Sequence, residues 1–150
     1  MTAENVNDLI SGCGLSGPID LLSLDIDGMD YWVWRAISAV QPRVVVCEYQ
    51  NPVPPDLALT VPYDPKFSIA TFADDFRGAS LKAMVNLGKT KGYRLVGTNR
   101  LGFNAFFVLD GVGDDLLAEV SPLNCSSDPY TQEAIRTRWP KVKDMGWVAV

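Results

Sequence analysis

Two carboxylates close an apolar run near the start of the chain, where they could take part in binding or catalysis. Asp25 and Asp27 end the segment Ile19–Gly28, whose apolar residues are too continuous to alternate with polar ones. Such a run predicts a strand buried on both faces of an α/β sheet, and open α/β sheets bind ligands at the carboxyl ends of their strands. Asp25 and Asp27 are therefore candidates for orienting a substrate hydroxyl or amine, accepting a proton or holding a divalent cation.

A third carboxylate follows the next predicted strand. Glu48 lies at the end of the apolar, β-branched segment 43–49, and Asn51 comes three residues later. Because the carboxyl ends of neighbouring parallel strands meet at one edge of a sheet, Glu48 should lie beside Asp25 and Asp27. We interpret these three acids as the candidate catalytic residues, and the same acids together with Asn51 as part of a substrate site.

A purely structural interpretation of the first two acids stays open. Asp25 can accept a hydrogen bond from a neighbouring loop amide, and Asp27 can cap the helix that follows it. The sequence itself assigns no residue to a metal ion or to a cofactor.

The proline-rich segment 50–75 adds two further candidates for the substrate site. Tyr63 and Asp64 lie between Pro62 and Pro65, in a stretch with no sustained periodicity. Long loops in compact domains are often functional, so this pair could form a lid over the acidic cleft. The alternative is a rigid turn between two prolines that covers apolar surface.

Residue types that are absent or scattered exclude several classes of enzyme. The chain has no histidine, which excludes Ser-His-Asp and Cys-His machinery and leaves proton transfer to carboxylates, Tyr, Lys or water. Its three cysteines, Cys13, Cys47 and Cys125, are widely spaced and fit neither a zinc motif nor a disulfide framework.

Bulk composition predicts a single soluble domain over residues 1–150. The chain is 47% hydrophobic and 21% charged, which is enough to bury a core at this length. Its net charge of −5 argues against nucleic acid as a partner. No apolar run approaches the roughly 20 residues of a membrane span, and Met1–Asn5 lack the start of a signal peptide, so we expect a cytoplasmic protein without membrane contact.

Periodicity and turn residues predict alternating strands and helices. Helices are expected at about 3–12, from Asp30 to about 37, at about 79–91, near 114–119 and near 129–138, and strands at about 19–26, 43–49, 93–98 and 103–109. Asp30 should cap the second of these helices. The last two strands should form an antiparallel hairpin.

Several segments, taken in order, resemble the C-terminal half of class I S-adenosylmethionine-dependent methyltransferases, particularly FkbM-type and related members. They are Asp20–Gly28, Val44–Asn51, Gly78–Leu81, and Lys91–Gly97 together with Asn104–Val108. The resemblance covers roughly residues 5–110, which leaves 111–150 as an extension packed on this core. It implies a truncated Rossmann-like α/β sheet of four main strands, mostly parallel, with an antiparallel hairpin at one edge and helices on both faces.

The resemblance also implies that a part of the fold is missing. In these methyltransferases a glycine-rich turn after the first strand and an acid after the second hold the cofactor, and this chain has neither. Gly12-Cys13-Gly14 suits the end of a helix instead. No cofactor is therefore expected, and S-adenosylmethionine would bind only if another chain completed the pocket. The strand at 19–26 would lack a neighbour on one side, so we expect a homodimer or higher homo-oligomer that pairs there.

Three functional hypotheses follow from the acidic strand ends and this resemblance. The first is a methyltransferase-like half-domain, not catalytic alone, that acts as a homo-oligomeric accessory module and binds a small molecule near Asp25, Asp27, Glu48 and Tyr63. The second is a methyltransferase whose S-adenosylmethionine pocket is completed by a partner chain or a second subunit. The third is a structural remnant without a ligand, and whether the chain is an enzyme stays open.

Overall fold

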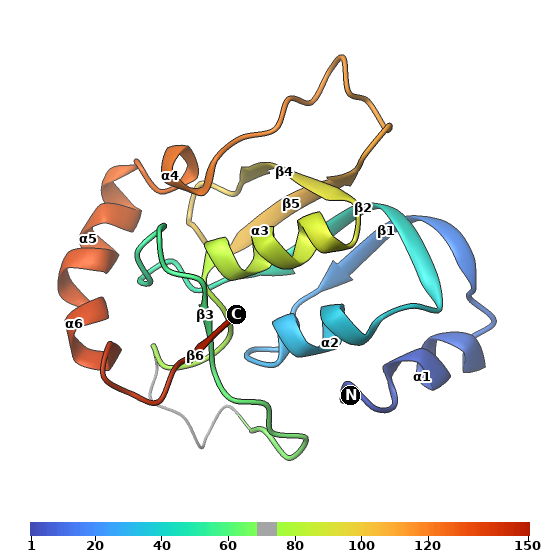
Figure 1. The fold of residues 1–150 in the computed structure, drawn as a ribbon, viewed down its shortest axis with the longest axis horizontal. Coiled ribbons are helices and arrows are strands. Elements are labelled where there is room, and N and C mark those ends of the chain that lie inside the picture. Colours follow the sequence, from blue (N-terminus) through green and yellow to red (C-terminus); the bar gives the residue numbers. More distant parts are fainter. Residues whose placement is uncertain (69–74) are drawn as a thin grey trace.

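The described residues of the computed structural model, 1–68 and 75–150, form a mixed α/β fold (Figure 1). Its elements are α1 (Val6–Gly12), β1 (Gly17–Leu24), α2 (Asp30–Ala36), β2 (Val40–Glu48), β3 (Leu59–Thr60), α3 (Leu81–Thr90), β4 (Tyr93–Thr98), β5 (Asn104–Leu109), α4 (Pro122–Cys125), α5 (Pro129–Thr137), α6 (Trp139–Val142) and β6 (Val148–Ala149). The four predicted strands correspond to β1, β2, β4 and β5. None of the helices in this described part combines the length and the apolar character that crossing a membrane requires.

The main sheet has the strand order β1-β2-β5-β4 within the described residues. β1 and β2 pair in parallel, with Leu24 beside Cys47, whereas β5 pairs antiparallel with both β2 and β4. The predicted hairpin is confirmed, but the expectation of mostly parallel pairing is wrong, because β5 turns back and enters the sheet between β2 and β4. β1, β2 and β4 still run in one direction, so their carboxyl ends lie at the same end of the sheet.

Helices α2 and α3 lie on the same face of this sheet, the one nearest the viewer in Figure 1. Trp34 of α2 packs against Phe107 of β5 at a ring-centroid distance of 5.0 Å, and Gly88 of α3 approaches the same ring. Both helices connect strands that step in one direction across the sheet, and right-handed crossovers then place both helices on one face. The expectation of helices on both faces is therefore wrong for these two connections.

The opposite face of the sheet, which we call the open face, carries apolar side chains that are only partly covered. Register and strand alternation place Leu21, Val44, Val46 and Phe106 on this face. The last three are half-buried, and Leu21 is 57% exposed. These side chains leave a strip of apolar surface that runs from β1 to β5.

β1 forms one edge of the main sheet, and its outer side has no partner strand in the described chain. The edge position agrees with the sequence expectation. Burial of β1 on both faces does not, because Leu24 is its one buried residue. The strand is exposed for two reasons, since it lacks a neighbour on one side and a covering layer on the open face.

The C-terminal segment returns to the rest of the fold through a second, two-stranded sheet. Within the described residues, β6 pairs antiparallel with β3, and the Trp147 ring packs edge-on against Phe76. The helix expected near 129–138 is present as α5. The helix expected near 114–119 is absent from this described stretch, which forms turns instead.

The side chain of Arg94 in β4 contacts this stretch of turns. Its guanidinium donates hydrogen bonds to the backbone carbonyls of Leu109, Val112 and Leu117 at 2.7 to 3.1 Å. These three hydrogen bonds attach the irregular stretch after β5 to β4.

Candidate functional site

Three carboxylates meet where β1 and β2 end. Leu24 pairs with Cys47, so the register brings Asp25, the next residue, beside Glu48. Carboxylate oxygens of Asp25, Asp27 and Glu48 all lie within 4.8 Å of one another. The structure thus brings together the three acids that the sequence proposed as a group, and we call them the carboxylate cluster.

A fourth acid, Asp30, holds the turn that carries two members of this cluster. Its carboxylate accepts hydrogen bonds from the backbone amides of Ile26 and Gly28, each at 3.0 Å. The expectation that Asp30 caps α2 is wrong, because the side chain reaches back to the turn before the helix and no side chain caps the helix at Met29. Burial raises the pKa of Asp30 to about 6.

The turn itself is tight at two positions. Asp27 has a positive φ of 61°, a conformation that few residues other than glycine adopt, although Asp tolerates it better than most. At the next residue, a Cβ atom on Gly28 would overlap the Phe67 ring, so any larger residue there would require this ring to move. The Asp30 hydrogen bonds and the Phe67 contact together fix the path of the chain through the cluster.

Glu48 is the buried member of the cluster. The residue is 8% exposed, and its Oε2 atom is buried without a hydrogen-bond partner in the described residues. Burial, followed by the negative charges of Asp30 and Asp25, raises the pKa of Glu48 to about 7, while the charge of Arg77 acts in the opposite direction. A large share of Glu48 side chains is therefore protonated near neutral pH.

Asp25 and Asp27 are exposed, and neither carboxylate has a hydrogen bond within the part of the chain that the structure describes. Among the residues that the structure describes, Asp25 thus binds no loop amide and Asp27 does not cap α2, so these contacts do not support the structural interpretation of the two acids. Both carboxylates can accept a hydrogen bond or coordinate an ion from solvent.

Arg77 acts on the cluster through its charge, and Gln50 packs against the residue that follows Arg77, although neither was among the predicted substrate-site residues. The Nε atom of Arg77 is buried without a partner in the described chain, and the residue acts electrostatically on Glu48. Gln50 is 5% exposed and packs against Gly78, which follows Arg77. The signal in the sequence is weak, because an Arg-Gly pair before a helix normally indicates a solvated helix start.

Asn51 points to a different part of the fold. Its side-chain oxygen accepts a hydrogen bond from Arg138 at 3.5 Å, and its amide group lies against Gly102. Arg138 also forms an ion pair with Asp75. The predicted role of Asn51 in the substrate site is not supported by these contacts, which instead attach the end of β2 to the C-terminal segment.

Tyr63 and Asp64 are held in place by contacts of their own. The Tyr63 hydroxyl donates to the Glu4 carboxylate and accepts from the Ala3 amide at 3.1 Å. Asp64 accepts a hydrogen bond from the Lys66 amide at 2.8 Å, within its own turn. These bonds favour the rigid turn over the lid.

The same two residues nevertheless border the turn of the cluster. Tyr63 and Asp64 line a cavity of about 170 Å³ together with Ile26 and Met29. Ile26 lies between Asp25 and Asp27 in the turn, but none of the three cluster acids lines this small cavity.

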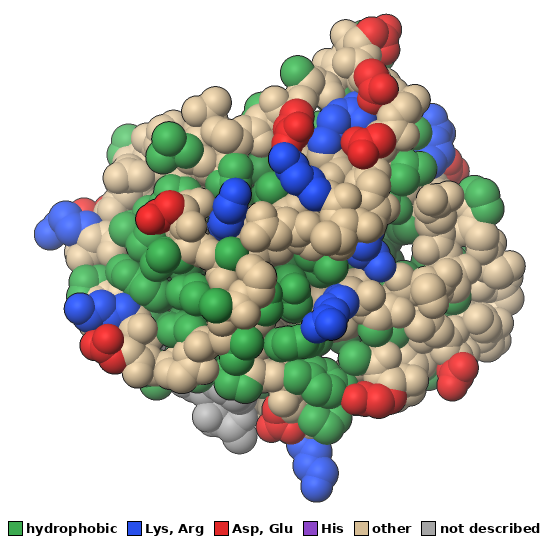
Figure 2. Space-filling view, viewed as in Figure 1, with side chains coloured by type: hydrophobic (Ala, Val, Ile, Leu, Met, Phe, Trp, Pro, Cys, Tyr) green, Lys and Arg blue, Asp and Glu red, His purple; other side chains and the backbone are tan. Residues whose placement is uncertain are grey.

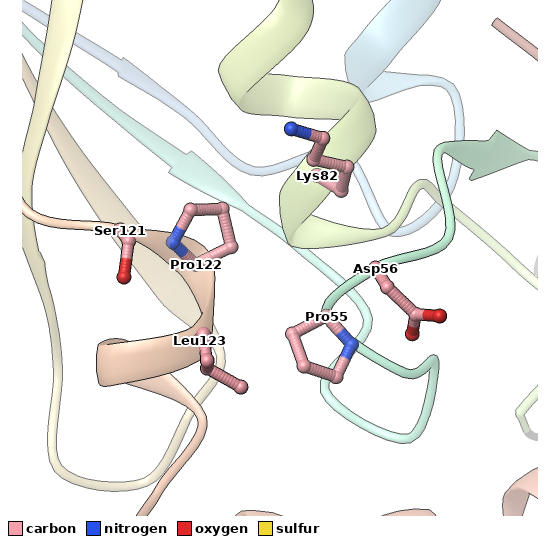
Figure 3. Close-up of a pocket in the computed structure, with 6 residues that line it drawn as sticks. All are labelled: Pro55, Asp56, Lys82, Ser121, Pro122 and Leu123. Carbon is pink, nitrogen blue, oxygen red and sulfur yellow. The ribbon is translucent and has the colours of Figure 1, made fainter.

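A larger cavity, of about 470 Å³, lies away from the carboxylate cluster, between the loop after β2, α3 and α4 (Figure 3). Leu123 and Pro122 face Pro55 across it, with Lys82 above (Figure 3). Hydrophobic side chains gather over this part of the helix-covered face (Figure 2). We place the candidate site at the cluster and not here, because the cluster is where a buried charged group lacks a partner.

The cluster offers oxygen acceptors, and Glu48 among them is buried, while Arg77 places a positive charge close enough to act on Glu48. Such a set can bind a hydroxyl group, an amine or a metal ion, and Glu48 can exchange a proton near neutral pH. Comparison of the chain with protein-family models, with curated proteins and with solved structures gave no match.

Proposed function

We propose that this chain is a methyltransferase-like half-domain that binds a small polar molecule at the carboxyl ends of β1 and β2 and does not catalyse a reaction alone. The observation that carries the proposal is the carboxylate cluster. One carboxylate oxygen of each acid lies within 4.8 Å of the other two, and the Oε2 atom of Glu48 is buried without a partner in the described residues. A buried acceptor without a donor is costly to the fold, which supports its use by a ligand.

The chemistry of the cluster favours a ligand that carries hydroxyl or amine groups. Asp25 and Asp27 are exposed acceptors, and Glu48 can accept a hydrogen bond when ionised or donate one when protonated. Arg77 adds one positive charge at the edge of the site. A ligand that is wholly anionic would be repelled by the three acids.

The order of elements supports the likeness to a methyltransferase half. Strand, helix, strand, helix and antiparallel hairpin follow one another in the order of the segments on which the resemblance rests. The edge position of β1 and the open face agree with a sheet that lacks neighbouring elements on that side. The cytoplasmic location expected from the sequence stays a prediction.

A second candidate function is methyl transfer with S-adenosylmethionine bound in a pocket that this chain shares with a second subunit or a partner chain. The observation that favours it is the place of the cluster at the end of an unpaired edge strand, where a further chain can approach. Methyl transfer would then proceed mainly by positioning the acceptor group beside the donor.

Thermal melting of the full chain separates the two functions. Saturating S-adenosylmethionine or its demethylated product should raise the melting temperature by several degrees if the chain holds the cofactor, and leave it unchanged if it is an accessory module. Glucosamine and ethanolamine test the polar-ligand site directly, and their effect should disappear in Asp25→Asn and persist in Asp20→Asn. The proposal fails if neither polar probe shifts the wild-type melting temperature at any concentration up to about 100 mM.

The homo-oligomer is part of the same proposal. The open face and the free edge of β1 favour a second copy that pairs along β1. Light scattering at micromolar concentration should give at least twice the chain mass, and Leu21→Lys, which places a charge on the open face, should shift the population toward single chains. If wild type is a monomer, the proposal of a homo-oligomer is wrong, while the proposal of a ligand site is unaffected.

A further inference from the structure

The carboxylate cluster presents three acidic side chains to one another, with no hydrogen-bond donor between them in the described residues. We propose that Asp25, Asp27 and Glu48 bind a divalent cation of the class formed by Ca²⁺, Mn²⁺ and Mg²⁺. This inference rests on the proposed function, because the cation would bind at the same site as the proposed small molecule.

The spacing of the oxygens fits one ion. Two oxygens that bind the same Ca²⁺ at about 2.4 Å can be at most about 4.8 Å apart. One carboxylate oxygen from each of the three acids satisfies this limit with respect to the other two. Mg²⁺ binds oxygens at about 2.1 Å, so the side chains would have to move closer together for it than for Ca²⁺.

Glu48 provides the second and independent observation. The residue is more than nine-tenths buried, its Oε2 atom has no partner in the described chain, and one of its oxygens lies inside the cluster. A buried carboxylate normally binds a donor, an opposite charge or a metal ion. Among these kinds of partner, a metal ion is the one that can bind Asp25, Asp27 and Glu48 at the same time.

The ligand types select the class of metal. The cluster contains oxygen ligands alone, and the chain has no histidine. Carboxylate oxygens favour hard cations such as Ca²⁺, Mg²⁺ and Mn²⁺, whereas zinc sites in proteins usually include Cys or His. Because Asp25 and Asp27 are exposed, an ion held here keeps positions open for water or for an oxygen of a bound molecule.

Titration of the full chain with Mn²⁺ tests the site, with the electron paramagnetic resonance signal of free Mn²⁺ as the readout. We expect one ion per chain with a dissociation constant below about 1 mM, the weak limit of protein calcium sites, and displacement by Ca²⁺. Glu48→Gln, Asp25→Asn and Asp27→Asn should each weaken Mn²⁺ binding at least tenfold. Asp20→Asn is the matched control, because this exposed acid lies on β1 outside the cluster, and its binding should stay within twofold of wild type.

Two results would overturn the cation site. One is an undiminished free Mn²⁺ signal up to several millimolar, and the other is an equal loss of binding in Asp20→Asn and in the cluster variants. Thermal melts of each variant in metal-free buffer identify those that fold, and the exposed positions 25 and 27 supply two variants besides Glu48→Gln. The polar-probe melts are run without metal, so the failure of cation binding and the failure of the proposed function are distinguishable.

Discussion

Each end of the main sheet has a charged side chain with little exposure to solvent, but only one of the two side chains has hydrogen-bond partners in the described residues. At one end Arg94 is 11% exposed, donates to three backbone carbonyls and forms an ion pair with Asp114 at 2.8 Å. At the other end Glu48 is 8% exposed, and its Oε2 atom has no partner in the described residues. Exposure alone therefore does not distinguish a structural charge from a candidate site, whereas the presence or absence of partners does.

Arg94→Ala should produce the largest loss of stability in this comparison. The change removes three charge-assisted hydrogen bonds and leaves backbone carbonyls of the 109–117 loop without a donor, which should lower the unfolding free energy by about 3 kcal/mol. Urea denaturation measures the loss. Arg94→Lys keeps the charge but not the fork of donors and should lose about half as much. An Arg94→Ala protein as stable as wild type would show that the charge at this end is not structural.

Asp30→Ala should have the next largest effect, because it removes the acid that holds the cluster turn. Loss of the hydrogen bonds from the Ile26 and Gly28 amides should lower the unfolding free energy by about 2 kcal/mol. Hydrogen exchange should also become faster at these two amides than at β5. Unchanged exchange at Ile26 and Gly28 would mean that the turn does not depend on Asp30.

Glu48→Gln should stabilise the metal-free protein at alkaline pH. The pKa of Glu48 is raised to about 7 in the folded state, so the folded protein holds a proton that the unfolded chain has released. The unfolding free energy of wild type should therefore fall as pH rises from about 4.5 through about 7. Above that window the variant should be more stable by about 2 kcal/mol, less than the whole shift implies because water screens the exposed Asp25 and Asp27.

Denaturation of wild type and Glu48→Gln at pH 4 and pH 8 checks this prediction. Because the negative charge of Asp30 helps to raise the pKa of Glu48, the difference between the two proteins at pH 8 includes the repulsion between these two acids. Equal stability of the two proteins at both pH values would show that Glu48 has a partner in solution.

The exposed ion pair between Arg43 and Asp20 should give the smallest effect. Its side chains are 60% and 91% exposed, and the two atoms lie 3.3 Å apart. Arg43→Ala should change the unfolding free energy by less than about 0.5 kcal/mol, because water already solvates both charges. Urea denaturation at low and high salt measures it, and a loss comparable to that of Arg94→Ala would remove the distinction between partnered and exposed charges.

The carboxylate cluster could be predicted from the sequence because its geometry depends on neighbouring elements. Two apolar runs joined through one short helix fix the parallel register of β1 and β2, and the register places Asp25 beside Glu48. The partners of other residues lie far along the chain. Tyr63 binds Glu4 across 59 residues, and Asn51 binds Arg138 across 87, and no local pattern encodes contacts at such separations.

In the fold, too, the features set by neighbouring residues could be predicted, and those set by contacts between distant segments could not. The hairpin of β4 and β5 follows from two strand patterns across a short turn, so it could be predicted. The insertion of β5 beside β2 could not, because it depends on which strand edge is free when the hairpin docks. Asp30 was misassigned for a related reason: a helix-start Asp has the same sequence signal whether its side chain turns to the helix or back to the preceding turn.

The position of β5 between β2 and β4 also bears on how the chain is made. β2 ends at Glu48, and its second neighbour begins at Asn104, so β2 emerges from the ribosome well before the strand that completes its pairing. During that interval a nascent chain presents one bare edge on β1 and another on β2, both open to other chains in the crowded cell. A chain that stalls before residue 104 should accordingly need chaperone protection that the finished protein does not.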